Sequence, residues 1–198
     1  MLENMRTVFT FVALWLSLGA FAQDTSQSAE ALLPLTAVEE SLADLPVMRE
    51  RKRIRALVSF SKTDFFLWRG TTRGFEAELL EEYQQFINRG TGREEDKIRV
   101  VYIPVPFGEL LPALRAGKGD LVAAGLTITD ERRQSVAFTE PYLPNVDEVL
   151  VSGSHIKAPT KVADLAGRAI YVLRGSSYAQ HLRELNARFE SQGGISIQ

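Results

Sequence analysis

Short apolar runs alternate with helix-like stretches through the middle of this sequence, and this alternation restricts the fold more than any other feature. The runs 54–60, 98–103 and 120–124 are predicted strands, and 75–88 and 107–115 are predicted helices. Neighbouring parallel strands need a long crossover, which a helix supplies. A βαβαβ order therefore predicts a parallel sheet with helices on both faces and right-handed crossovers. The predicted fold class is α/β.

Helical spacing of apolar side chains gives the predicted helix 75–88 one hydrophobic face. The residues expected to point into the core from this face are Phe75, Leu79, Tyr83, Phe86 and Ile87. The predicted helix 107–115 contains Pro112, whose ring removes one backbone donor and disfavours a position deep inside a helix.

A second unit of the same kind begins after Pro141 and Pro144. The run 146–151 is a predicted hinge strand, 169–173 is a further predicted strand, and 177–189 is a predicted helix. Because the sequence ends soon after this helix, the second lobe is predicted to be incomplete. Ligand binding by this chain alone is accordingly predicted to be weak or absent.

Residues 1–22 have the pattern of an export signal. A short basic region precedes the apolar run 7–19, which is too short to span a bilayer, and small residues follow at Ala20 and Ala22. This pattern predicts cleavage before Gln23 and a periplasmic location, with an uncleaved membrane anchor as the alternative.

The composition changes along the chain predict four segments. The stretch 23–50 is rich in Ser, Ala and Glu, and we interpret it as a flexible tether with a short helix-like part at 37–45. The segments are a signal peptide at 1–22, the tether at 23–50, a first solute-binding lobe at 51–145, and a hinge strand with a partial second lobe at 146–198.

Several functions lose support on composition. The chain has no cysteine and only two histidines, His155 and His181, so we predict no metal site, no cofactor and no catalytic residue. The net charge is −2, which does not indicate nucleic acid as a partner. Basic residues gather at 49–55, but Glu50 interrupts them, and a solvated strand entry explains them as well as a nucleic-acid or membrane contact does.

The turn 125–132 follows the third predicted strand, where open α/β sheets bind their ligands. Thr129 is a predicted N-cap that would place Arg132 at the third helical position, and Gly125 allows backbone to approach a bound group closely. An arginine beside a hydroxyl and free amides suits a carboxylate. The alternative is a capped surface helix with a solvated arginine.

A second strand-to-helix turn, 175–178, offers hydroxyls and backbone N–H groups to an anion. Ser177 as a simple helix N-cap, with no ligand, explains the same residues.

Four segments, taken in order, resemble the extracellular solute-binding proteins of family 3, the polar amino-acid receptors of bacterial import systems. GFEAELL at 74–80 resembles the family's G-F-D-x-D-L-A, with Glu78 at the second aspartate. PVPFGELLPAL at 104–114 resembles its strand-to-helix passage, and GKGDL at 117–121 its G-K-x-D strand entry. AGLTITDERRQSVAFTEP at 124–141 resembles A-G-x-T-I-T-x-E-R followed by F-S-x-P. The resemblance implies a periplasmic-binding-protein-like fold of two lobes that close on a solute.

This resemblance also implies the roles of individual residues in the first lobe. Thr127 and Arg132 match positions that hold the α-carboxylate of the ligand, and Gly125 matches one whose backbone faces the cleft. Phe107 matches an aromatic that packs on the ligand, with a staple over the following helix as the alternative.

Further positions are implied outside these motifs. Ser177, with Ser176 beside it in the Gly-Ser-Ser turn, matches the contribution of the second lobe. Asp64 and Phe65 lie where the family has a polar residue and an aromatic in the cleft, although the spacing here departs from the family pattern.

The stretch 61–86 resembles more particularly the amino-terminal sensor domain of lytic transglycosylase F-like proteins. The Glu-Ser dipeptides at 40–41 and 190–191 lack the motif around the catalytic glutamate of such enzymes, so the chain is not predicted to be an enzyme. We predict an exported module that binds a small polar solute, an amino acid or a muropeptide. Its expected partner is an ABC permease or, alternatively, a covalently linked transglycosylase domain that it regulates.

Overall fold

A three-stranded parallel sheet lies at the centre of the computed structural model, which describes residues 32–34 and 38–198. Its strands are β1 (Arg53–Val58), β4 (Arg99–Pro104) and β5 (Leu121–Ala123), in the order β4-β1-β5, so β1 is paired on both sides. The predicted parallel sheet and its βαβαβ order are confirmed. The predicted signal peptide lies outside the described residues.

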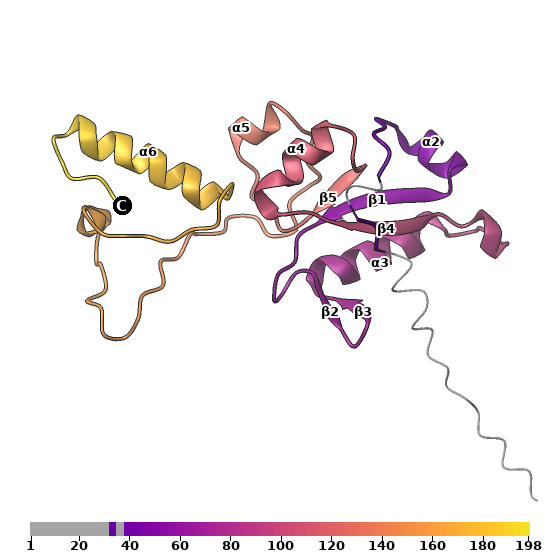
Figure 1. Cartoon of the computed structure of the whole chain (residues 1–198), viewed down its shortest axis with the longest axis horizontal. Coiled ribbons are helices and arrows are strands. Elements are labelled where there is room, and N and C mark those ends of the chain that lie inside the picture. Colours follow the sequence, from indigo (N-terminus) through magenta and orange to yellow (C-terminus); the bar gives the residue numbers. More distant parts are fainter. Residues whose placement is uncertain (1–31, 35–37) are drawn as a thin grey trace, which may run out of the picture.

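Helices cover both faces of this sheet (Figure 1). Helix α3 (Phe75–Ile87) lies on one face, and the short 3₁₀ turn η3 (Phe107–Glu109) leads into α4 (Leu110–Arg115) on the other. Pro112 falls in the first turn of α4, where the missing N–H would have had no helical partner.

Alternate residues of β1 build two hydrophobic cores. Ile54, Ala56 and Val58 pack on the α3 side, whereas Leu57 packs with Ile103 on the α4 side. Each large side chain that is fully buried in these cores contributes about 1.5–3 kcal/mol.

The face that α3 buries differs from the predicted one. Ile87 is buried and Tyr83 packs on the core, as predicted, but Phe75, Leu79 and Phe86 are 50%, 43% and 58% exposed, and Ala77 and Leu80 are buried in their place. We attribute this rotation of α3 to its polar side chains Gln84 and Asn88, which form hydrogen bonds with the outer edge of β4.

Two amides and the N-terminal segment satisfy the outer edge of β4. The Val100 N–H donates to Gln84 Oε1 (2.6 Å), and Asn88 bonds both the N–H and the C=O of Ile98 (2.8 Å each). The Leu33 N–H donates to the Tyr102 carbonyl (2.9 Å). An edge covered in this way cannot pair with another chain.

The described part of the predicted tether packs against the sheet. Arg55, buried on β1, donates to the carbonyls of Glu39 (2.6 Å) and Ser41 (2.7 Å) and pairs with Asp120 (2.8 Å). The predicted helical part at 37–45 is wrong over the described residues 38–44, which are not helical. The helix begins only at α2 (Leu45–Glu50), which has a proline in its first turn, where proline favours a helix start.

A hairpin connects β1 to α3. Its strands are β2 (Phe66–Trp68) and β3 (Thr71–Arg73), joined through Arg69 and Gly70 with φ of 51° and 81°. Two consecutive residues of positive φ are typical of a tight hairpin turn. The remaining short turn in this half is η2 (Glu94–Asp96).

The second unit forms fewer strands than predicted. Neither 146–151 nor 169–173 is a strand, and the side chain of Tyr171 is 95% exposed, because no described strand lies beside these segments along their length. The unit contains η4 (Val162–Leu165) and the predicted helix, α6 (Ser177–Ser191).

Parallel pairing nevertheless begins in this unit. The Gln198 N–H donates to the Arg168 carbonyl (2.9 Å), and the Ile170 N–H donates to the Gln198 carbonyl (2.9 Å). Asn186 of α6 bonds both the N–H (2.6 Å) and the C=O (2.9 Å) of Ile197, as Asn88, the C-cap of α3, does with Ile98. The second unit therefore repeats the helix-to-strand connection of the first.

Across the part of the chain that the structure describes, no helix combines the length and the apolarity that crossing a bilayer requires.

Candidate functional site

The turn after β5 leads into α5 (Asp130–Arg133) as predicted. Thr129 is the N-cap, and its Oγ1 accepts a hydrogen bond from the Arg132 N–H (3.3 Å). This cap fixes Arg132 at the third helical position, from which its side chain reaches back toward the end of β5.

The Arg132 side chain is held by two backbone carbonyls. Its Nη1 donates to the Thr127 carbonyl (2.7 Å) and its Nη2 to the Gly175 carbonyl (2.9 Å), and the residue is only 9% exposed. Burial lowers the pKa of the Arg132 guanidinium, and the charge of Glu131 acts in the opposite direction. Arginine still stays charged in proteins, so this is a buried positive charge without an ion-pair partner among the described residues.

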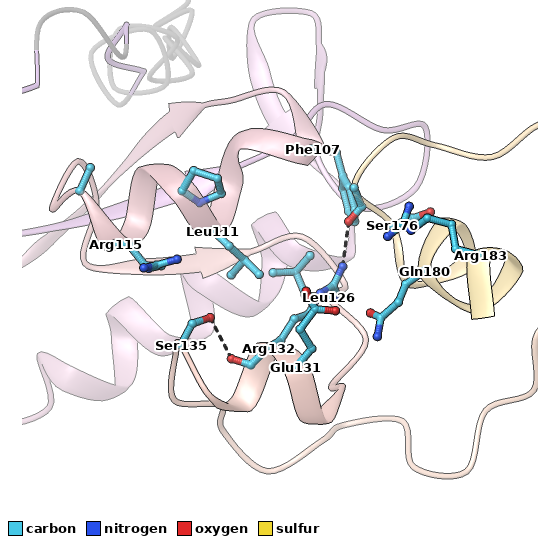
Figure 2. A pocket seen from close by; sticks show the side chains of 14 residues that line it. Phe107, Leu111, Arg115, Leu126, Glu131, Arg132, Ser135, Ser176, Gln180 and Arg183 are labelled. Atoms are coloured by element: carbon cyan, nitrogen blue, oxygen red, sulfur yellow. Dashed lines mark hydrogen bonds between the residues drawn. The ribbon is translucent and has the colours of Figure 1, made fainter. Parts of the chain in front are cut away.

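Arg132 lies in the wall of a cavity of about 620 Å³ between α4, α5 and the start of α6 (Figure 2). This volume is within the range of small-molecule sites. Of the predicted site residues, Phe107, Arg132 and Ser176 line the cavity. The structure therefore brings together residues from three separate segments of the sequence.

The Gly-Ser-Ser turn of the second unit closes against the first unit through glycine backbone. A Cβ on Gly175 would lie 2.7 Å from the Gly108 Cα, so the two backbones touch. The N-cap of α6 is Ser176, whose Oγ accepts from the Ala179 N–H (3.3 Å), and not Ser177, the N-cap of the alternative interpretation. Ser177 follows as a buried first residue of the helix.

Gly125 makes a contact that the sequence did not indicate. Its φ is +58°, and its N–H donates to Glu76 Oε1 (2.6 Å), which also accepts from the Tyr142 hydroxyl (2.9 Å). The backbone donor expected to face a ligand is thus bonded to a buried carboxylate of α3. The signal that could have indicated Glu76 is an acidic residue among apolar ones in the G-F-E motif.

Glu76 also changes the acidity of Tyr142. Burial, the hydrogen bond to Glu76 and the negative charges of Glu76 and Asp64 raise the pKa of the Tyr142 hydroxyl to about 12. The hydroxyl therefore stays protonated at neutral pH and remains a donor to Glu76.

Asp64 and Phe65 lie outside the cavity wall. The Asp64 carboxylate accepts from the hydroxyls of Ser61 (3.0 Å) and Thr63 (3.2 Å). Phe65 is fully buried and packs on Phe60 and Tyr102, with ring centroids 5.6 and 5.1 Å apart. The sequence resemblance placed Phe65 in the cleft, whereas in this structure its ring belongs to the core that packs on β1.

No group of three or more His, Asp or Glu side chains among the described residues is arranged to hold a metal ion. His181 Nδ1 lies 2.7 Å from Glu148 Oε1 in a partly exposed pair that joins α6 to the chain leaving the first unit.

The fold and the turn around Arg132 define a class of binding protein. The chain belongs to the bacterial extracellular solute-binding proteins, family 3, whose sequence profile matches residues 59–188. The predicted family and the periplasmic-binding-protein-like fold are confirmed. The description of this family is that of extracellular proteins that bind solutes.

Individual proteins of known name share about a third of their residues with this chain over the aligned part. The chain is 33% identical over 125 residues to a probable histidine-binding protein of Campylobacter jejuni, covering 63% of this chain and 45% of that protein. It is 31% identical over 146 residues to the L-arginine-binding protein of Pseudomonas aeruginosa, covering 72% and 52%. It is also 31% identical over 158 residues to membrane-bound lytic murein transglycosylase F of Pseudomonas fluorescens, covering 79% and 31%. The chain thus spans about half, or less, of the length of these relatives.

Solved structures agree on the fold. Holo ArgBP from T. maritima superimposes with a TM-score of 0.56 at 20% identity, covering 78% of this chain and 62% of that one. An ancestral arginine-binding protein bound to arginine gives 0.52 at 23% identity, covering 75% and 60%.

Proposed function

We propose that this chain binds a small polar, amino-acid-like solute by its carboxylate, with Arg132 as the main anchor. The observation that supports the proposal is a buried guanidinium at the wall of a ligand-sized cavity, where a parallel strand is followed by a helix. Arginine presents five N–H donors in a planar fork that matches a carboxylate. Two of these donors are occupied by carbonyls, which a ligand carboxylate can replace as the stronger acceptor.

The other predicted site residues have supporting roles in this proposal. Thr127 and Gly125 belong to the turn that positions Arg132, and Phe107 supplies an apolar wall. Ser176 and Ser177 stand at the N-terminus of α6, a 15-residue helix whose first N–H groups favour an anion. Closure of the two units excludes water and strengthens the pairing of charges.

Export through a cleavable signal peptide and a periplasmic location belong to the same proposal. The family profile and the apolar run at 7–19 support them. A solute-import function would also require a membrane permease that binds the closed form of this protein.

Replacing Arg132 by alanine tests the site. We expect the Arg132→Ala variant to bind amino acids about 100-fold more weakly, because hydrogen bonds to charged groups contribute about 1.5–3 kcal/mol each. Titration followed by NMR, with a panel of amino acids at millimolar concentration, detects weak binding as well as strong.

Arg133→Ala is the matched control, since Arg133 is the next residue of α5 and is exposed outside the cavity. Equal affinity in the Arg132→Ala and Arg133→Ala variants would remove Arg132 from the site.

A second candidate function is regulation of a linked lytic transglycosylase domain. It is favoured by the match that covers 79% of this chain but 31% of the transglycosylase F of Pseudomonas fluorescens. Muropeptides added to the titration panel distinguish the two functions, because a transport receptor is expected to prefer free amino acids. The genomic sequence downstream of the codon for Gln198 provides an independent test.

A further inference from the structure

The cavity between α4, α5 and α6 has an excess of positive charge. Arg115 of α4, Arg132 of α5 and Arg183 of α6 line it, and Glu131 is the one acidic residue in its wall. None of these arginines has a carboxylate within ion-pair distance among the described residues. The wall therefore carries a net charge of about +2 that the described part of the protein leaves uncompensated.

The three arginines come from different helices and stand around one space. In the view of Figure 2, Arg115 and Arg183 lie on opposite sides of Arg132. The other polar groups of the wall are neutral, such as the Ser135 hydroxyl, which donates to the Arg132 carbonyl (3.1 Å), and the Gln180 amide. Glu131 is the one side chain in this wall that could pair with a positively charged group of a ligand.

We propose that the ligand of this cavity carries two carboxylates, as an acidic amino acid or a related dicarboxylic acid does. The inference rests on the proposed function, in which Arg132 holds one carboxylate. Arg115 and Arg183 then supply the charge that favours the second. The relative named for L-arginine binds a ligand with a cationic side chain, and the positive charge of this cavity wall would repel such a side chain.

The exposure of the two outer arginines sets the size of the expected preference for a ligand with two carboxylates. Arg115 and Arg183 are exposed, unlike Arg132. Exposed ion pairs contribute about 0.2–1 kcal/mol each, so the two together favour a second carboxylate about 2- to 30-fold.

The test compares two ligands that differ only in one carboxylate. L-glutamate and its neutral isostere L-glutamine are titrated into the chain, together with L-arginine as the cationic probe and glutarate as the dicarboxylic acid without an amino group. We expect glutamate to bind about 10-fold more tightly than glutamine, and arginine more weakly than both. Glutarate binding equal to that of glutamate would identify a dicarboxylic acid rather than an amino acid as the ligand, which still supports two carboxylates.

Variants then assign the preference to residues. In the double variant Arg115→Gln/Arg183→Gln, the ratio of glutamate affinity to glutamine affinity is expected to be about 1. Lowering the salt concentration should increase this ratio in the wild type but have less effect on it in the double variant, because salt screens exposed charges. Arg188→Gln, an exposed position on α6 outside the cavity, is the control and should keep the wild-type ratio. Both changes are at exposed positions, and a retained NMR spectrum shows that the variants fold.

The possible failures are distinguishable. A wild-type ratio near 1, or tighter binding of arginine than of glutamate, overturns the two-carboxylate inference, while sensitivity to Arg132→Ala would leave the proposed function standing. A wild-type preference for glutamate that persists in the double variant overturns the roles of Arg115 and Arg183. Binding of none of the four probes, either by this chain or by the chain extended with any downstream coding sequence, contradicts both proposals.

Discussion

Asp120→Ala is expected to lower the free energy of unfolding by about 3–5 kcal/mol, because it leaves a buried arginine without its counter-charge. The Asp120 side chain is 1% exposed. Its carboxylate accepts hydrogen bonds from the Arg55 guanidinium (2.8 Å), from the Arg55 backbone N–H (2.7 Å) and from the Arg51 guanidinium. Arg55 in turn holds the carbonyls of Glu39 and Ser41. Urea unfolding followed by circular dichroism measures the loss.

Asp96→Ala is the matched control for this measurement. Asp96 pairs with Lys52 (2.9 Å) and with Arg93 (2.5 Å) in partly exposed bridges, and each such bridge contributes about 1 kcal/mol or less. A loss for Asp120→Ala no larger than that of the control would show that the Arg55–Asp120 network does not stabilise the fold.

The same network predicts a pH dependence. Burial raises the pKa of the Asp120 carboxyl, but the hydrogen bonds from Arg55 and Arg51 outweigh it, so the folded pKa is lowered. A lowered folded pKa means that the stabilisation is present above the unfolded value of about 3.9 and is lost as the pH falls through the folded pKa. Stability should therefore fall in strong acid, and less steeply in the Asp120→Ala variant, when unfolding is repeated between pH 2 and pH 6.

Gly74→Ala is expected to have the second large effect, a loss of about 3 kcal/mol or more. Gly74 has φ +117° and ψ 166°, a region that is essentially restricted to glycine and costs about 1–3 kcal/mol for other residues. An added Cβ would also overlap the Asp64 carbonyl, with its carbon at 2.6 Å and the Thr63 oxygen at 2.9 Å. These are backbone atoms, so the overlap cannot be relieved by a side-chain rotation.

The strain at Gly74 would reach the candidate site. The Thr63 and Asp64 carbonyls accept from the first N–H groups of α3 at Phe75 (3.0 Å) and Glu76 (2.9 Å). Moving them apart would displace Glu76, which holds Gly125. Gly90→Ala is the control, since Gly90 has φ +82° but open space around it. Melting temperatures of the two variants separate backbone strain from overlap, and equal values would contradict the overlap argument.

Local signals in the sequence predicted the elements whose structure is decided locally. The short apolar runs became β1, β4 and β5, and the threonine before Asp130 became the predicted N-cap of α5. The strand-end rule for open α/β sheets also indicated the turn that contains Arg132. These features depend on spacing and propensity within a few residues.

The sequence did not predict features that depend on contacts between residues far apart along the chain. Helical periodicity did not reveal that Gln84 and Asn88 would bond β4 and turn Phe86 outward. Phe65 reads as a cleft aromatic until the core beneath β1 is known, and Glu76 finds its partner, Gly125, 49 residues away. The run 146–151 has strand propensity, but a strand also needs a neighbour, which the described residues do not provide.

The paired asparagines have a consequence for how the chain acquires its structure. Asn88 and Asn186 each bond a residue only 10 or 11 positions ahead, Ile98 and Ile197. Loops of this length close in about 10–100 ns, long before contacts between distant segments can be made. Each helix can therefore align the extended segment that follows it without help from the other unit. Two independent nuclei of this kind would let one half of the molecule loosen while the other stays ordered.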